Sequence, residues 1–455
     1  MKLKHYAFLV EYVFLGEENI KNMLLELKEK KTLLLWVLLV VIFFIGIKLR
    51  WEALDIVRLN QWLTRDIDRA LNLFNDNYFP LAGPDTTNGL RLPGPFLYIL
   101  MAIPFFFDPS YDSLFNFYFL INSASLVVSF WVVKKYFDFG TAFIVTALQS
   151  THLLYIEAIA FPINPTFLLP LIPFLLWAIL EFSLNKNEKA LPYFGLIISL
   201  GIQIHLSIAT FLLVPFMWCI IYRVRVSIKT IFQTILISLT TFLPFIYFSF
   251  NSYKAPLFIT HVTKLDLFSS FFEPFKILTV QNTINRLTDF SIGQGNLANF
   301  INVSKFFTLI QFGLLNLSLL AIVLFIFFNI KKRGTKSYQK GIIVFLFFYC
   351  PALVYDIIRP WDRHFWYNYI FILPAVLLVS ISLVKLKKFL AEKQLTIFFK
   401  LTTTSLILYI LVSNVLHFNK VKNLIQNSSK IGEYQNFNVT RKLQTIWSNE
   451  LNIPI

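Results

Sequence analysis

The sequence predicts an all-α polytopic membrane protein with about eleven transmembrane helices. The 455 residues are 56% hydrophobic and 18% aromatic, and only 15% are charged. Apolar stretches of roughly membrane-spanning length also recur along the whole chain. Soluble domains carry about 25% charged residues, so this chain has too few charges to cover soluble surfaces. The composition therefore excludes a cytosolic enzyme, a secreted disulfide scaffold and a disordered chain.

The predicted spans follow from the length that a helix needs, about 20 apolar residues, to cross the hydrocarbon core. Before the first span, residues 1–31 mix lysines with glutamates, which predicts a cytoplasmic amphipathic helix and no cleavable signal peptide. The run Pro95–Phe107 is short and rich in proline, so we expect it to be interfacial or re-entrant. The predicted spans are 32–50, 113–133, 139–157, 162–182, 190–206, 207–222, 230–250, 306–330, 341–358, 365–384 and 398–417.

Basic residues predict the orientation, because Lys and Arg collect in loops that stay cytoplasmic. Every second predicted loop is basic, which places these loops and the N-terminus in the cytoplasm. The same bias accounts for the net charge of +16, so nucleic-acid binding is not expected. The basic clusters begin at Lys134, Lys186, Arg223, Lys331 and Lys385.

This topology divides the chain into five parts. Residues 1–31 form the cytoplasmic N-terminus, and 32–250 form a transmembrane core that includes a first outer loop at 51–112. A second outer loop at 251–305, C-terminal helices at 306–417 and a short outer tail at 418–455 follow. Without a separate soluble domain, chemistry is expected at the outer membrane face.

The first outer loop holds the acids of greatest interest. Its stretch 59–75 predicts an amphipathic helix that contains Asp66 and Asp68. Residues two positions apart on a helix are separated by about 200° of rotation, so these two side chains are not expected to face one pocket. Either carboxylate is suited to act as a general base toward a hydroxyl or to help bind a divalent cation. The alternative is an interfacial helix whose charges merely pair with one another.

Two further positions at predicted outer ends of spans carry polar side chains. Glu157 is an acid at a membrane boundary, which by default indicates a functional site, although a carboxylate reaching the interface is the alternative. Gln203 and His205 lie near the outer turn between the fifth and sixth spans. They are candidates for binding a phosphate or a sugar hydroxyl, or for a neutral hydrogen bond between helices.

The last predicted outer turn, Arg359–Trp366, contains Arg359 and Arg363 among aromatic residues. Guanidinium groups there suit a lipid phosphate, and an anchoring aromatic belt is the alternative. No P-loop, GxGxxG or HExxH motif occurs, so no cytosolic nucleotide site is evident. The span centres carry almost no charge, which argues against an ion or proton pump.

Three features resemble the integral-membrane glycosyltransferases of the type C fold. The likeness is greatest to the bacterial branch of protein O-mannosyltransferases and lipid A aminoarabinose transferases (glycosyltransferase family 39). It covers roughly residues 30–225. The first feature is the loop from Arg65-Asp66 through Phe79-Pro80-Leu81-Ala82-Gly83-Pro84 to Leu92-Pro93-Gly94-Pro95-Phe96-Leu97-Tyr98. The others are Glu157 followed by Asn164-Pro165, and the Gln-x-His pattern of Gln203 and His205.

The resemblance implies a glycosyltransferase of the type C fold with a catalytic carboxylate in the first outer loop. Asp66 is the first choice and Asp68 the second. The chain departs from the family pattern at Trp62 and Leu63, where many relatives have an Asp-Glu or Asp-Gln pair. The expected donor is a sugar on polyprenyl phosphate, transferred with inversion to a glycan, lipid or protein acceptor. The expected location is a bacterial inner membrane, within glycan biosynthesis of the cell envelope. Glu157 is the third candidate catalytic residue, and the candidates for binding substrate or lipid phosphate are Arg65, Arg69, Tyr98, Asn164, Gln203, His205, Arg359 and Arg363.

No metal site is assigned from the sequence, although a divalent cation fits the chemistry of such acids. Two other classes remain open at this point. A flippase or exporter of lipid-linked glycans needs a charged or wet path through the spans. An O-antigen-type polymerase or ligase, by contrast, is expected to depend on arginines and histidines in late outer loops. A structural membrane protein without a catalytic role is the remaining alternative.

Overall fold

The computed structural model describes residues 33–59, 61–75, 79–85, 91–252, 320–358 and 369–392, with short pieces between 317 and 436. Several expectations lie wholly or partly outside these residues: the amphipathic N-terminal helix, nearly all of the second outer loop, about half of the span at 306–330, the turn with Arg359 and Arg363, and most of the tail at 418–455.

Helices make up nearly all of the described structure. The helices are Leu33–Ile56 (called the first helix here, with η1, Leu54–Ile56, as its last turn), α2 (Gln61–Asn75), α3 (Phe96–Ala102), α4 (Tyr111–Tyr136), α5 (Phe139–Thr151), α6 (Leu153–Ala160), α7 (Ile172–Asn185), α8 (Ala190–Ile204), α9 (Leu213–Tyr222), α10 (Ile228–Ser252), α14 (Lys336–Ile358) and α15 (Ile372–Glu392). Short 3-10 helices are η2 (Ile103–Phe106), η3 (Asn164–Leu171), η4 (Leu206–Leu212) and η7 (Ile330–Lys332). Two-residue strands β1 (Arg58–Leu59) and β2 (Gln435–Asn436) pair antiparallel.

The all-α membrane fold predicted from the sequence is confirmed. Within the described residues, six helices are long and apolar enough to cross a membrane, or up to seven if the bent pair of α5 and α6 counts as one span. Shorter apolar helices occur at Phe96–Phe106, Ala190–Ile204, Leu206–Tyr222 and Ile407–Leu416. The count of about eleven spans therefore stays a prediction. The long helices are Leu33–Ile56, Tyr111–Tyr136, Asn164–Asn185, Ile228–Phe250, Lys336–Tyr355 and Tyr369–Lys387.

Two histidines mark the breaks between helices. The sequence predicts a continuous span over 139–157, but the chain bends by 42° between α5 and α6. His152 lies in the bend with extended backbone, and its ring accepts a hydrogen bond from the Leu154 N–H. His205 breaks the uncharged run 190–222 in the same way, and its Nδ1 accepts from the Ser207 N–H. At the start of α6 and of η4, the imidazole thus accepts from a backbone N–H that has no partner within its own helix.

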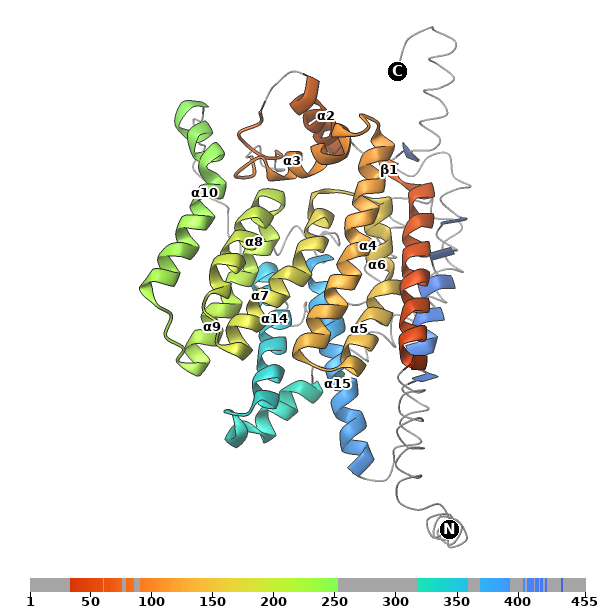
Figure 1. Ribbon diagram of the computed structural model, residues 1–455, viewed down its shortest axis with the longest axis vertical. Coiled ribbons are helices and arrows are strands. Elements are labelled where there is room, and N and C mark those ends of the chain that lie inside the picture. Colours follow the sequence, from red (N-terminus) through yellow and green to blue (C-terminus); the bar gives the residue numbers. More distant parts are fainter. Residues whose placement is uncertain are drawn as a thin grey trace, which may run out of the picture.

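The bundle has two different ends (Figure 1). Helices α2 and α3 lie together at one end, close to the start of α4 and the end of α8, and the connection from α9 to α10 lies toward the other end. The predicted interfacial run Pro95–Phe107 is helical as α3 and η2 but is too short to cross a bilayer. Lys422 of the C-terminal segment pairs with Asp55 at 2.9 Å and with Glu52 at 3.5 Å. The start of the tail thus lies at the α2 end of the first helix.

The first helix continues to Ile56, past the predicted end at residue 50, and contains a buried charged residue. Arg50 has no exposed surface, and its guanidinium donates to the carbonyl of Gly46 in its own helix at 3.0 Å. It also donates to the carbonyls of Ser150 at 2.8 Å and Gln149 at 3.1 Å. These two carbonyls lie in the last turn of α5, where the bend removes the N–H donors four residues on that a continuous helix would supply. Arg50 therefore joins the first helix to the bend between α5 and α6.

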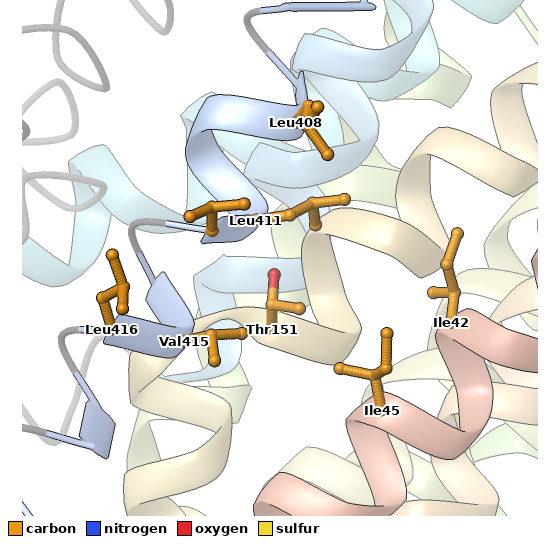
Figure 2. Close-up of a pocket in the computed structure, with 8 residues that line it drawn as sticks. Ile42, Ile45, Thr151, Leu408, Leu411, Val415 and Leu416 are labelled. Atoms are coloured by element: carbon orange, nitrogen blue, oxygen red, sulfur yellow. The ribbon is translucent and has the colours of Figure 1, made fainter.

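An apolar pocket of about 250 Å³ separates the first helix from the C-terminal segment (Figure 2). All but one of its lining residues are aliphatic, and Thr151 at the end of α5 supplies the single hydroxyl. Such a lining offers no charge and almost no hydrogen bonds to a sugar or phosphate. The lining residues are Ile42, Ile45, Thr151, Leu408, Leu411, Val412, Val415 and Leu416.

Candidate active site

Helix α2 places Asp66 on its buried face. Leu63, Ile67 and Ala70 on that face are buried, as residues three and four apart on a helix share one side. Asp66 lies among them with only 1% of its surface exposed. Asp68 is exposed and accepts a hydrogen bond from the hydroxyl of Tyr111 at 3.1 Å. The two acids thus face different surroundings, as the helical geometry predicts.

In the carboxyl group of Asp66, hydrogen bonds from the described residues reach only one of the two oxygens. Its Oδ1 accepts from Nε and Nη2 of Arg65, both at 2.9 Å, and from the hydroxyl of Tyr98 at 3.4 Å. Its Oδ2 is buried and accepts no hydrogen bond from the described residues. Burial raises the pKa of Asp66 from 3.8 to about 6, although the charges of Arg65 and Arg69 and these hydrogen bonds act in the opposite direction. A carboxyl group with this pKa is suited to exchange a proton near neutral pH.

Three guanidinium groups surround a second acid, Asp85. Its Oδ2 accepts from Arg69 at 2.9 Å and lies 3.5 Å from Arg65, and its Oδ1 accepts from Arg91 at 3.0 Å. Partial burial alone would raise the pKa of Asp85, but the guanidinium of Arg69, followed by Arg91 and Arg65, holds it below its ordinary value. Arg69 also donates to the Tyr98 hydroxyl at 2.9 Å, which links this cluster to Asp66.

A turn between α2 and α3 positions the side chains of Asp85 and Arg91. The N–H of Gly83 donates to the carbonyl of Leu92, and the N–H of Leu92 donates to that of Pro84, both at 2.9 Å. These bonds bring Asp85 and Arg91 opposite one another. Gly94 then turns the chain with φ of +127°, a conformation that favours glycine.

Gln203 fastens this turn to two helices. Its Oε1 accepts from the N–H of Phe96 at 3.2 Å, and its Nε2 donates to the carbonyl of Thr241 in α10 at 2.9 Å. Both polar ends of the buried amide are thus used within the protein. Gln203 is placed as a support for the start of α3, which carries Tyr98.

Comparison with solved structures identifies this arrangement of helices. ArnT from Cupriavidus metallidurans bound to undecaprenyl phosphate matches over 87% of this chain and 74% of its own, with a TM-score of 0.51 and 12% identity. The Archaeoglobus fulgidus oligosaccharyltransferase AglB, in complex with an inhibitory peptide and a dolichol-phosphate, matches over 86% of this chain with a TM-score of 0.52 and 14% identity. The chain has the type C glycosyltransferase fold.

Sequence comparison alone does not reach this result. No protein family profile matches the chain, and no curated protein matches it significantly. A second structure of the Archaeoglobus fulgidus oligosaccharyltransferase, in complex with Zn and sulfate, has a TM-score of 0.51 at 16% identity, covering 84% of this chain. This chain spans only 53% and 56% of the two oligosaccharyltransferase chains. At such identities the likeness shows the type C fold and the membrane-embedded helices, and nothing finer.

The structure brings four of the predicted site residues of this type C chain together: Arg65, Asp66, Arg69 and Tyr98. Gln203 bonds to the backbone at Phe96, two residues before Tyr98. Glu157 is buried in α6 and Asn164 begins η3, so both lie on the segment after the α5 bend. His205 lies between α8 and η4 and bonds to Ser207. Among the residues that the structure describes, the hydrogen bonds around Asp66 and Asp85 reach none of these three.

The acids near α2 do not fit a metal site in this arrangement. Asp66 and Asp85 are both paired with guanidinium groups, whose positive charges disfavour a bound cation. Among the described residues, no group of three or more His, Cys, Asp or Glu side chains is placed to hold a metal ion. No step is therefore assigned to a metal.

Sequence reasoning did not single out Asp85 and Arg91. Each is one of several charged residues in the first outer loop, and neither lies in a distinctive motif. They lie six residues apart on either side of a loop, with Asp85 directly after Pro84 and Arg91 two residues before Pro93. This spacing is the signal that favours pairing across a turn. Their contribution to the site becomes clear only when the loop folds against Arg65 and Arg69.

Proposed function

We propose that this type C chain transfers a sugar from a polyprenyl-phosphate donor to an acceptor hydroxyl. The observation that carries the proposal is the buried Asp66, which has one carboxylate oxygen that accepts no bond from the described residues. It is bonded to Arg65, which belongs with Arg69 and Arg91 to the cluster of three guanidinium groups around Asp85. A base and a phosphate-binding group are the two parts that such a transfer needs.

In the proposed reaction, Asp66 acts as the general base. The acceptor oxygen forms a bond to the anomeric carbon, and the bond from that carbon to the phosphate oxygen breaks. The electron pair of the broken bond leaves with the polyprenyl phosphate, and the proton of the acceptor hydroxyl passes to Oδ2 of Asp66. A single displacement of this kind inverts the anomeric centre.

The arginines are proposed to bind the leaving group. Negative charge grows on the phosphate as the glycosidic bond breaks, and preorganised guanidinium groups stabilise that charge in the transition state. Arg65 and Arg69 are held within reach of Asp66 by short bonds. His205, Asn164, Arg359 and Arg363 remain proposed as further contacts to the donor, and Glu157 as a group that orients sugar or acceptor.

The reaction is proposed to take place at the outer face of the membrane. The charges of the connections between helices support this location. The last turn of α4 carries Lys134 and Lys135, and Lys186 and Arg223 directly follow α7 and α9. Basic loops stay in the cytoplasm, so the opposite end with α2 and α3 is assigned to the outside. A lipid-linked donor suits that side, where nucleotide sugars are absent. ArnT, which shares the fold, was solved with undecaprenyl phosphate bound.

The alternative functions differ in their dependence on Asp66. A flippase of lipid-linked glycans has no bond to break, so it does not need a general base. A polymerase or ligase also transfers glycans, but its acceptor is itself a glycan carried on a lipid. It is expected to depend on arginines and histidines in late outer loops and not on Asp66. The acceptor in the present proposal is left as a glycan, lipid or protein hydroxyl.

The proposal is tested by sugar release from a panel of radiolabelled polyprenyl-phosphate sugars, using the purified full-length protein with candidate acceptors. We expect release with at least one donor and inversion of the anomeric configuration in the product. Lipid flipping without release by folded protein would contradict the proposal and favour a flippase.

The raised pKa of Asp66 predicts a pH dependence. A base must be ionised, so kcat/KM should rise with pH through about 6 and fall about tenfold per pH unit below it. The pH profile of sugar release, measured between pH 4.5 and 8.5, checks this. Asp68→Asn should keep the same midpoint, because that exposed acid lies apart from Asp66. A midpoint near 4 would mean that another, ordinary carboxylate is the base.

A further inference from the structure

One carboxylate among three guanidinium groups is an unusual balance of charge. Arg65, Arg69 and Arg91 all lie within 3.5 Å of Asp85. Each guanidinium has five N–H donors, and the bonds described for each use only some of them. Donors therefore remain for another anion while Asp85 is in place.

The cluster is accessible to a ligand from solution. The Asp85 side chain is 30% exposed, and those of the three arginines are 26% to 36% exposed. Asp66 beside them is 1% exposed. An incoming phosphate would thus meet the guanidinium groups and Asp85 together, before it meets Asp66.

The charges of the cluster favour a particular kind of phosphate. Above pH 6 the three guanidinium groups face two carboxylates, Asp66 and Asp85, which leaves one net positive charge among these five side chains. A sugar on a monophosphate-linked lipid is a phosphodiester with one negative charge. A sugar on a diphosphate-linked lipid carries two. Only the first is neutralised by this cluster without excess charge.

We propose that Asp85 is a specificity-determining counterion, which makes the site prefer a singly charged phosphodiester donor over a diphosphate donor. The inference rests on the proposed function, because it assigns the donor's phosphate to these arginines. Asp85 occupies guanidinium donors that a second phosphate group would otherwise bind, and it repels that group. Like charges that meet at a binding site lower affinity for the wrong ligand.

The experiment compares two probes with the same tail on the full-length protein in detergent. Farnesyl methyl phosphodiester carries one negative charge, and farnesyl methyl diphosphate carries two. Their Kd values are measured for the wild type, Asp85→Asn and Asp108→Asn by displacement of a fluorescent prenyl phosphate. Asp108 is an exposed acid of the same loop whose side chain bonds to Ser110, and it serves as the matched control.

We expect the wild type to bind the phosphodiester more tightly than the diphosphate. Asp85→Asn should shift the ratio of the two Kd values by about fivefold toward the diphosphate, a size typical of partly exposed charges. The ratio should stay unchanged in Asp108→Asn. Arg91→Gln removes one positive charge but keeps Asp85, so it should shift the ratio in the opposite direction. This second variant tests the proposal if Asp85→Asn does not fold.

The possible results separate two failures. If the wild type binds both probes, but Asp85→Asn and Arg91→Gln weaken both equally, Asp85 only holds the loop and the counterion proposal is wrong. The proposed function then stands. If the wild type binds neither probe and releases no sugar, the proposed function itself fails, and the counterion role fails with it.

Discussion

Asp66→Asn is expected to remove sugar transfer, lowering kcat by about 10²- to 10⁴-fold. Asparagine has nearly the same shape and its oxygen still accepts the bond from Arg65, but the amide cannot take a proton from the acceptor hydroxyl. Donor binding through Arg65 and Arg69 should change much less than kcat. The measurements are single-turnover sugar transfer and binding of the donor by the same purified variant.

Asp68→Asn is the matched control for this prediction. Asp68 lies two residues away on the same helix but is exposed and bonded to Tyr111. Its loss should leave kcat within a few-fold of the wild type. If Asp68→Asn removed transfer and a folded Asp66→Asn did not, the base would be Asp68, the second choice from the sequence. If both variants kept the activity of the wild type, Glu157 would become the candidate base.

Gly94→Ala is expected to lower kcat/KM by about 10²-fold without touching a charged group. The φ of +127° strains any residue with a Cβ atom, at a cost of about 1–3 kcal/mol. The added Cβ would overlap Oε1 of Gln203, so the amide must leave both of its bonds, those to Phe96 and Thr241. Steady-state kinetics and the thermal midpoint of the purified variant check this prediction.

The control for Gly94→Ala is Gly334→Ala, where a Cβ atom would meet nothing within 4 Å. That change should leave kinetics and the thermal midpoint near those of the wild type. In the double variant Gly94→Ala/Gln203→Ala, the total loss should be smaller than the sum of the single losses, because both changes break the same support. Full activity of Gly94→Ala would contradict the role of Gln203 as a support for the turn.

Much of the fold is readable from the sequence because hydrophobic length and the positions of prolines are local properties. The amphipathic period around Ile67 correctly predicts α2. The short proline-rich run folds as the short helices α3 and η2, and its interfacial or re-entrant placement stays a prediction. The 42° bend at His152 was not predicted, because a neutral imidazole within an apolar run gives no clear helix-ending signal. The same residue type at His205 coincides with the predicted boundary of two spans.

The site is less predictable than the fold because its contacts join distant parts of the chain. The pairing of Asp66 with Arg65 follows from neighbouring positions, but Gln203 reaches Phe96 across 107 positions. The sequence suggested Gln203 as a ligand for substrate, whereas its amide is placed between two helices. Asp85 draws its importance from three arginines that only the folded loop brings to it.

The buried Arg50 has a consequence for the biogenesis of the protein in the membrane. The carbonyls that bind it belong to residues 149 and 150, which are synthesised about 100 positions later. An arginine inside an apolar helix is costly without partners, so the first helix should sit at a shallower depth until α5 inserts beside it. Glycosylation mapping of its outer end should show a shift in depth between nascent chains that stop before and after α5. Arg50→Leu should abolish that shift, and equal depth in both chains would mean that Arg50 finds other partners during synthesis.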